Sequence, residues 1–120
     1  METETEYVLH SMPAINKGEC VVVPKRHVEN LRELSANELT SLIRTVQQVS
    51  VVLHSNLLPM GFTYGSDEGE YTGERDTHFK FHIIPRFMND EQGNFFGKEK
   101  KMTEKQIQSM VTEIRSFFEK

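Results

Sequence analysis

A short row of basic and imidazole side chains is the part of this chain most able to carry chemistry. His78, Lys80 and His82 alternate with apolar residues in the run His78–Arg86. Such alternation is typical of a β-strand, on which successive side chains point to opposite faces. The three polar side chains would then share one face and could bind an anion or transfer a proton. The solvated face of a half-buried strand would have the same pattern.

Two histidines four residues apart also raise the question of a metal site. On a strand, four residues span about 13 Å, so the imidazoles of His78 and His82 cannot easily bind one ion. The sequence therefore predicts no metal site and no cofactor.

Three further motifs precede this row. They are Val23–His27, which reads Val-Pro-Lys-Arg-His, and the glycine turns Gly61–Gly65 and Gly69–Gly73. In this order and spacing, followed by His-Ile-Ile-Pro-Arg, the chain resembles the histidine triad (HIT) family of nucleotide-binding proteins and hydrolases. The resemblance runs from about residue 7 to about residue 87. It implies an α+β HIT-like fold, with an antiparallel sheet of about five strands, one long helix and a C-terminal helix.

The chain departs from the family pattern at the position that carries the reaction. The family signature is His-φ-His-φ-His-φ-φ, where φ is hydrophobic, and its central histidine is the nucleophile that attacks the α-phosphorus. Here Lys80 stands at the central position, while His78 and His82 keep the outer ones. His27 resembles a family residue that supports the triad, although a hydrogen-bonded structural histidine would look the same. The resemblance thus implies a nucleotide site without the family's nucleophile.

Further departures fall on positions that contact the ligand in the family. The resemblance assigns these positions to His10, Asp67, Gly73, Glu74, Arg75 and Asp76. Ionised carboxylates accept hydrogen bonds but do not donate them, so Asp67, Glu74 and Asp76 would repel a phosphate. Lys80 and Arg75 could act as counter-ions, or the same charges could form an ion network that fills the pocket. The sequence leaves both arrangements open.

Three functions follow from these alternatives. The first is a degenerate HIT protein that binds a purine nucleotide or nucleoside phosphate without turnover. The second is an active nucleotidyl hydrolase or transferase on phosphoramidates or dinucleoside polyphosphates, using Lys80 or altered chemistry. A lysine amine must be neutral to attack phosphorus, and nearby carboxylates oppose this. The third is an interaction module with a closed pocket. HIT proteins typically pair as two-fold dimers, so the resemblance also implies a homodimer.

Composition sets limits on partners and location. The chain has 120 residues, 37% of them hydrophobic and 27% charged, which is typical of one globular domain spanning 1–120. Its formal net charge of −4 argues against nucleic acid as a partner. No apolar run is long enough for a membrane span, and the acidic start is unlike a signal peptide, so we expect a cytoplasmic protein. Cys20, the one cysteine, is expected in the core.

Periodicity and capping patterns predict the elements that position these residues. Strands are expected at 7–9, 18–24, 61–65 and 79–85. A capping box at Ser35 predicts a helix that ends near Leu58, before Pro59, and a second box at Thr103 predicts a C-terminal helix. The long helix should turn one apolar face inward, consisting of Leu39, Leu42, Ile43, Val46, Val49, Val52 and Leu53. Four apolar residues could line a base pocket or simply fill the core: Leu9, Val21, Val23 and Phe62.

Overall fold

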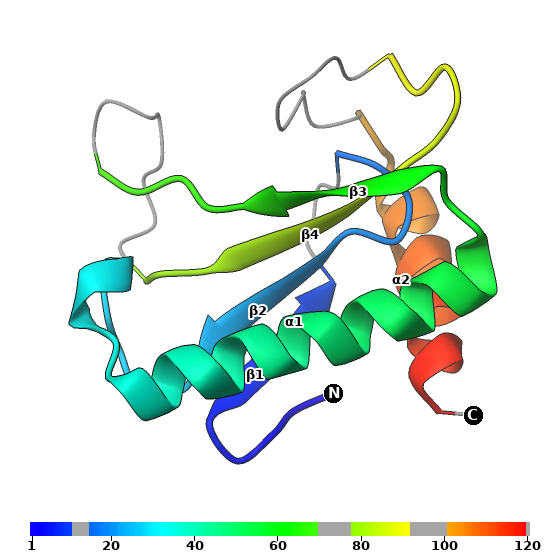
Figure 1. The fold of residues 1–120 in the computed structure, drawn as a ribbon. Helices are drawn as coiled ribbons and strands as arrows, with labels where there is room; N and C mark the ends of the chain where they lie inside the picture. Colours follow the sequence, from blue (N-terminus) through cyan, green and yellow to red (C-terminus); the bar gives the residue numbers. More distant parts are fainter. Residues whose placement is uncertain (11–14, 70–77, 92–100, 120) are drawn as a thin grey trace.

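An antiparallel sheet covered by two helices makes up the fold (Figure 1). The computed structural model describes residues 1–10, 15–69, 78–91 and 101–119. The strands, in sheet order, are β1 (Glu6–His10), β2 (Cys20–Pro24), β4 (Phe81–Arg86) and β3 (Gly61–Gly65). The helical elements are the short η1 (Leu31–Glu33), the long α1 (Ala36–Leu57) and α2 (Glu104–Phe118). This confirms the α+β fold, with four strands among the described residues in place of about five. No helix in the described ranges is long and apolar enough to cross a membrane.

Both predicted helix starts are confirmed by their capping boxes. The Ser35 hydroxyl accepts a hydrogen bond from the Glu38 backbone N–H at 3.1 Å, and the Glu38 carboxylate accepts one from the Ser35 N–H at 2.9 Å. Thr103 and Gln106 form the same reciprocal pair at the start of α2. These bonds satisfy N–H groups that have no partner inside the helix. The predicted end of α1 is also confirmed, because Leu58 adopts a left-handed conformation before Pro59.

The core lies between the helices and one face of the sheet. Directly paired residues such as Cys20 and Ile83 project from the same face, and both are fully buried with Leu42 and Val49 of α1. The sequence prediction was wrong for Leu39 and Ile43, which are 37% and 53% exposed. The apolar residues of α1 that are buried form a narrower stripe than predicted, consisting of Leu42, Val46, Val49 and Leu53.

Strand β4 begins later than the alternating pattern predicts. It starts at Phe81, because the Phe79 N–H donates to the carbonyl of Val28 at 2.7 Å and not to a ladder with β2. Phe79 is nevertheless buried in the core, as the pattern predicted. The residues just before β4 therefore run beside the segment that follows β2.

A glycine turn leads into β2. Gly18 has a φ of +90°, which L-residues rarely adopt, and a Cβ on it would lie 2.4 Å from the Leu57 Cδ1 atom. The absence of a side chain allows the turn to pack against the end of α1. This turn sets the direction in which the next residue, Glu19, enters the sheet.

Candidate functional site

A hydrogen-bonded pair with little solvent exposure joins His82, the third residue of the triad-like row, to Glu19, which directly precedes β2. The His82 Nδ1 atom lies 2.8 Å from the Glu19 Oε2 atom, and the two side chains are 14% and 1% exposed. The second carboxylate oxygen of Glu19 accepts the Ile15 backbone N–H at 2.7 Å. Val21 pairs with His82 across the two strands, so both project from the same face of the sheet. Glu19, two residues before Val21, projects from that face as well. The two oxygens of this fully buried carboxylate thus connect His82 of β4 to the backbone at Ile15.

The pair fixes which nitrogen of His82 carries hydrogen. An ionised carboxylate can only accept a hydrogen bond, so Nδ1 of His82 must donate to Glu19. In the neutral ring, Nε2 then carries a lone pair on the side away from Glu19. An imidazole oriented in this way by a carboxylate can accept a proton or hydrogen-bond a ligand.

His78 and His27 lie together at the other end of the row. Their ring centroids are 4.9 Å apart. His78 donates its Nε2–H to the carbonyl oxygen of Pro24 at 2.8 Å, which anchors its ring to the end of β2. The predicted closeness of His27 to the triad-like row is therefore present in the structure, with His27 exposed and His78 half-buried.

Lys80 occupies the middle of the row, between the two anchored histidines. Its side chain is half-buried, and it stands just before β4 begins. Along the chain, His78, Lys80 and His82 place one amine and two imidazole groups just before and within the start of β4. Such a row can attract and orient a phosphate, which is a task for positive charge and N–H donors.

His10 is not brought together with this row. It pairs with Cys20 across β1 and β2, which places it on the helix-covered face of the sheet, and its ring lies 5.9 Å from that of Phe118. Burial, with the positive N-terminus and Arg115, lowers the pKa of His10 to about 4. Burial raises the pKa of Cys20, whose Sγ atom lies 3.5 Å from the His10 ring, to about 12. Both shifts favour the neutral pair, so this Cys–His contact is unsuited to nucleophilic chemistry.

The remaining predicted ligand positions follow β3 in the sequence. Asp67 is exposed, and its neighbour Glu68 accepts hydrogen bonds from the Leu31 N–H at 3.1 Å and from Arg32 at 3.2 Å. These bonds tie the loop to η1. The other four positions lie outside the described residues: Gly73, Glu74, Arg75 and Asp76.

The apolar residues that could line a base pocket divide between the two faces of the sheet. Strand pairing puts Leu9 and Val21 on the face of His82, where Leu9 is 52% exposed. Val23, two residues after Val21, shares this face and is buried. Phe62 pairs with Pro85 and therefore faces α1. Leu9 is thus the one of the four that offers substantial apolar surface beside the site.

Sequence reasoning missed Glu19 as a site residue. A charged residue directly before the apolar run of β2 was the available signal. The partner of Glu19 is 63 residues away in the chain, and only the pairing of β2 with β4 identifies it. Within the described residues, no group of three or more His, Cys, Asp or Glu side chains could hold a metal ion.

Comparisons with known proteins identify the family. Residues 1–89 match the HIT domain family. A bis(5'-adenosyl)-triphosphatase of Dictyostelium discoideum is 29% identical over 98% of this chain and 83% of its own length. An uncharacterized HIT-like protein of Methanocaldococcus jannaschii is 36% identical over 72% of this chain and 67% of its own length. A hypothetical histidine triad nucleotide-binding protein of Sulfolobus tokodaii superimposes with a TM-score of 0.80 at 24% identity, covering 99% and 81% of the two chains. The chain therefore belongs to the HIT domain family.

Proposed function

We propose that this chain binds a purine nucleotide or a related nucleoside phosphate beside His82 and does not carry out hydrolysis through a nucleotidyl-histidine intermediate. The phosphate would lie against Lys80 and the imidazole of His82, and the base would contact the exposed surface of Leu9. Dinucleoside polyphosphates are included in this ligand class, because the Dictyostelium relative is a bis(5'-adenosyl)-triphosphatase. Cytoplasmic location and the lack of a nucleic-acid partner stay predictions from composition.

The observation that carries this proposal is the lysine at position 80. The family reaction needs an imidazole lone pair at this position, whereas a protonated amine has none to give. A protonated lysine still attracts phosphate as a point charge. Binding is therefore expected to survive the replacement, and covalent turnover is expected to be lost.

The test separates binding from turnover. AMP and diadenosine triphosphate are titrated by calorimetry, and AMP release from an adenosine phosphoramidate is followed with protein in excess, together with intact protein mass. We expect binding, no AMP release and no added nucleotidyl mass. Lys80→Ala should weaken binding, while Lys25→Ala, which removes a lysine paired with Glu2, should leave it unchanged. Absence of binding in the wild-type protein would refute the proposal.

An active enzyme is the alternative function, favoured by the identity with the Dictyostelium triphosphatase. Product release or a nucleotidyl adduct that disappears in Lys80→Ala would establish it. Lys80→His restores the central imidazole of the signature. If hydrolysis stays absent in this variant, other residues of the site have also lost the family reaction.

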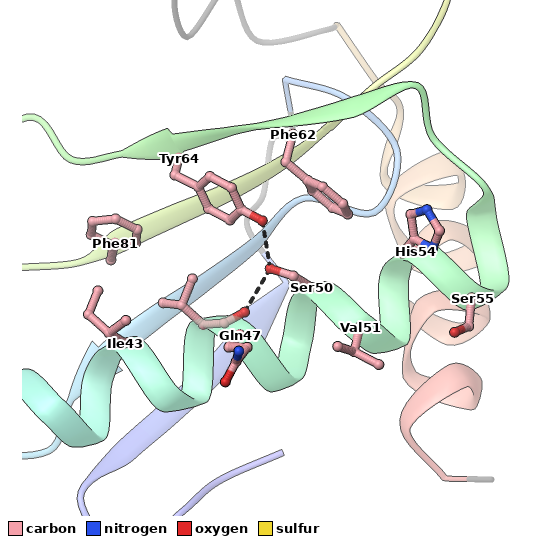
Figure 2. A pocket seen from close by; sticks show the side chains of 10 residues that line it. Ile43, Gln47, Ser50, Val51, His54, Ser55, Phe62, Tyr64 and Phe81 are labelled. Carbon is pink, nitrogen blue, oxygen red and sulfur yellow. Dashed lines mark hydrogen bonds between the residues drawn. The ribbon is translucent and has the colours of Figure 1, made fainter.

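A homodimer is part of the proposal and is supported by an apolar groove between α1 and β3 (Figure 2). The rings of Phe62, Tyr64 and Phe81 project from the sheet toward α1, and the groove has a volume of about 540 Å³. Ile43 and Val51 on its helix side are 53% and 61% exposed. The Tyr64 hydroxyl donates to Ser50 at 3.0 Å, which holds the ring over the helix.

Strand β3 is also at the end of the described sheet, so its outer edge has no strand neighbour among the described residues. A second copy related by a two-fold axis could cover both the groove and this edge. Sedimentation should show a dimer for the wild-type protein and for Gln48→Glu, and a monomer for Ile43→Glu. A dimer that fails to bind nucleotide would support the third function, an interaction module with a closed pocket.

A further inference from the structure

A second cavity lies between the turn before β2 and the first half of α2. Its volume of about 580 Å³ is in the range of small-ligand sites. None of its lining residues belongs to the row around His82. The residues that line it are Asn16, Lys17, Lys101, Met102, Lys105, Gln106, Ser109, Met110 and Glu113.

Asn16, which lines this cavity, has a buried side-chain oxygen that accepts no hydrogen bond from any described residue. The residue is fully buried. Its Nδ2 atom donates to the Pro85 carbonyl oxygen at 2.9 Å and to the Asp90 Oδ2 atom at 2.8 Å. Both of these partners are acceptors, so the amide cannot flip without placing oxygen against oxygen. A buried acceptor left in this state is costly, and a donor from a ligand or a water would remove that cost.

The rim of the cavity is positively charged in a chain of net negative charge. Three lysines surround it, and the one carboxylate, Glu113, lies 2.9 Å from the Lys17 ammonium. The lining thus has a formal excess of two positive charges, compared with −4 for the whole chain. Lys101, just before α2, and Lys105, in its first turn, are both exposed. Met102 and Met110 add apolar surface to the lining.

From this combination we propose that the cavity binds a small phosphate ester that carries free hydroxyl groups, such as a sugar phosphate. The phosphate would contact the ammonium groups of Lys101 and Lys105. A ligand hydroxyl would donate to the Asn16 side-chain oxygen, and the carbon skeleton would lie on Met102. This site is separate from the nucleotide site proposed above and does not depend on it.

The test uses ribose 5-phosphate as the probe. Inorganic phosphate and ribose, which correspond to its two parts, serve as control ligands. Amide chemical shifts of the nitrogen-labelled protein are followed during each titration. We expect ribose 5-phosphate to shift the backbone signals of Lys17, Lys105 and Gln106, together with the side-chain NH₂ signals of Asn16. It should bind at least about tenfold more tightly than inorganic phosphate, and ribose alone should cause no saturable shift.

Two variants locate the site. Lys105→Met keeps the aliphatic stem and removes one rim charge, so it should weaken ribose 5-phosphate binding at least about fivefold. Arg44→Met removes a positive charge from an exposed position of α1 outside the cavity and should leave binding unchanged. Equal affinity for inorganic phosphate and ribose 5-phosphate would show only a diffuse lysine patch and overturn the proposal. Unchanged Asn16 side-chain signals would show that the probe makes no contact with Asn16. Shifts confined to His82 and its neighbours would assign the probe to the nucleotide site. Either result overturns the proposal.

Discussion

Replacing Glu19 with glutamine should move the hydrogen of His82 from one ring nitrogen to the other. Glu19 uses one oxygen for the Ile15 N–H and the other for His82 Nδ1. A glutamine has one oxygen and one NH₂ group, and the Ile15 N–H can only donate. The oxygen must therefore stay on Ile15, which turns the NH₂ group toward Nδ1. His82 can accept this bond only with its hydrogen on Nε2.

The expected cost in stability follows from the same two bonds. Both persist in Glu19→Gln but lose the help of a full charge, and hydrogen bonds to charged groups are stronger than neutral ones by about 1 kcal/mol each. We therefore expect a loss of about 2 kcal/mol in the free energy of unfolding. Glu19→Ala removes the carboxylate that accepts both bonds and should cost about 3–5 kcal/mol.

Nitrogen chemical shifts of the imidazole ring report the tautomer directly, at a pH where a free imidazole is neutral, and urea unfolding reports stability. Glu6→Gln is the matched control, because Glu6 is also buried but accepts bonds from the rotatable hydroxyls of Thr3 and Thr45. It should leave the His82 tautomer unchanged. If Glu19→Gln keeps hydrogen on Nδ1, the assignment of Glu19 as the residue that orients His82 is refuted.

Three further predictions concern the framework of the site. Gly18→Ala should cost about 1–3 kcal/mol in urea unfolding, because of its φ of +90° and the close approach of Leu57 and Pro85, while Gly61→Ala, with no atom within 4 Å of its Cβ, should be nearly neutral. The pKa of His10 is lowered to about 4 in the folded protein, so the unfolded chain binds the extra proton first and stability should fall as the pH drops from about 6.5 toward 4. Unfolding at pH 7 and pH 5 should show a smaller fall for His10→Gln, and an equal fall would contradict this assignment. Ser35→Ala should cost about 1 kcal/mol through loss of the α1 cap, whereas Ser55→Ala, an exposed position on the same helix, should cost clearly less; equal losses would mean that the cap contributes little.

Several features of the fold were predictable because neighbouring residues determine them. The two capping boxes and the stop before Pro59 depend on contacts within four residues, and each was read correctly from the sequence. The strand β2 and the burial of Cys20 follow from the local run of apolar residues. The lysine at position 80 is likewise a fact of sequence, and the proposal that the chain lacks the family reaction rests on it.

Other features required the tertiary structure, because they depend on contacts between distant segments. The register of β2 against β4 brings Glu19 to His82, and the pairing of β1 with β2 turns His10 toward α2. The contact between Phe79 and Val28 delays the start of β4, which periodicity could not reveal. The sequence determined which side chains the site could contain. The pairing of the strands decided which of them meet, since a residue's position in a sheet fixes both its face and its neighbours.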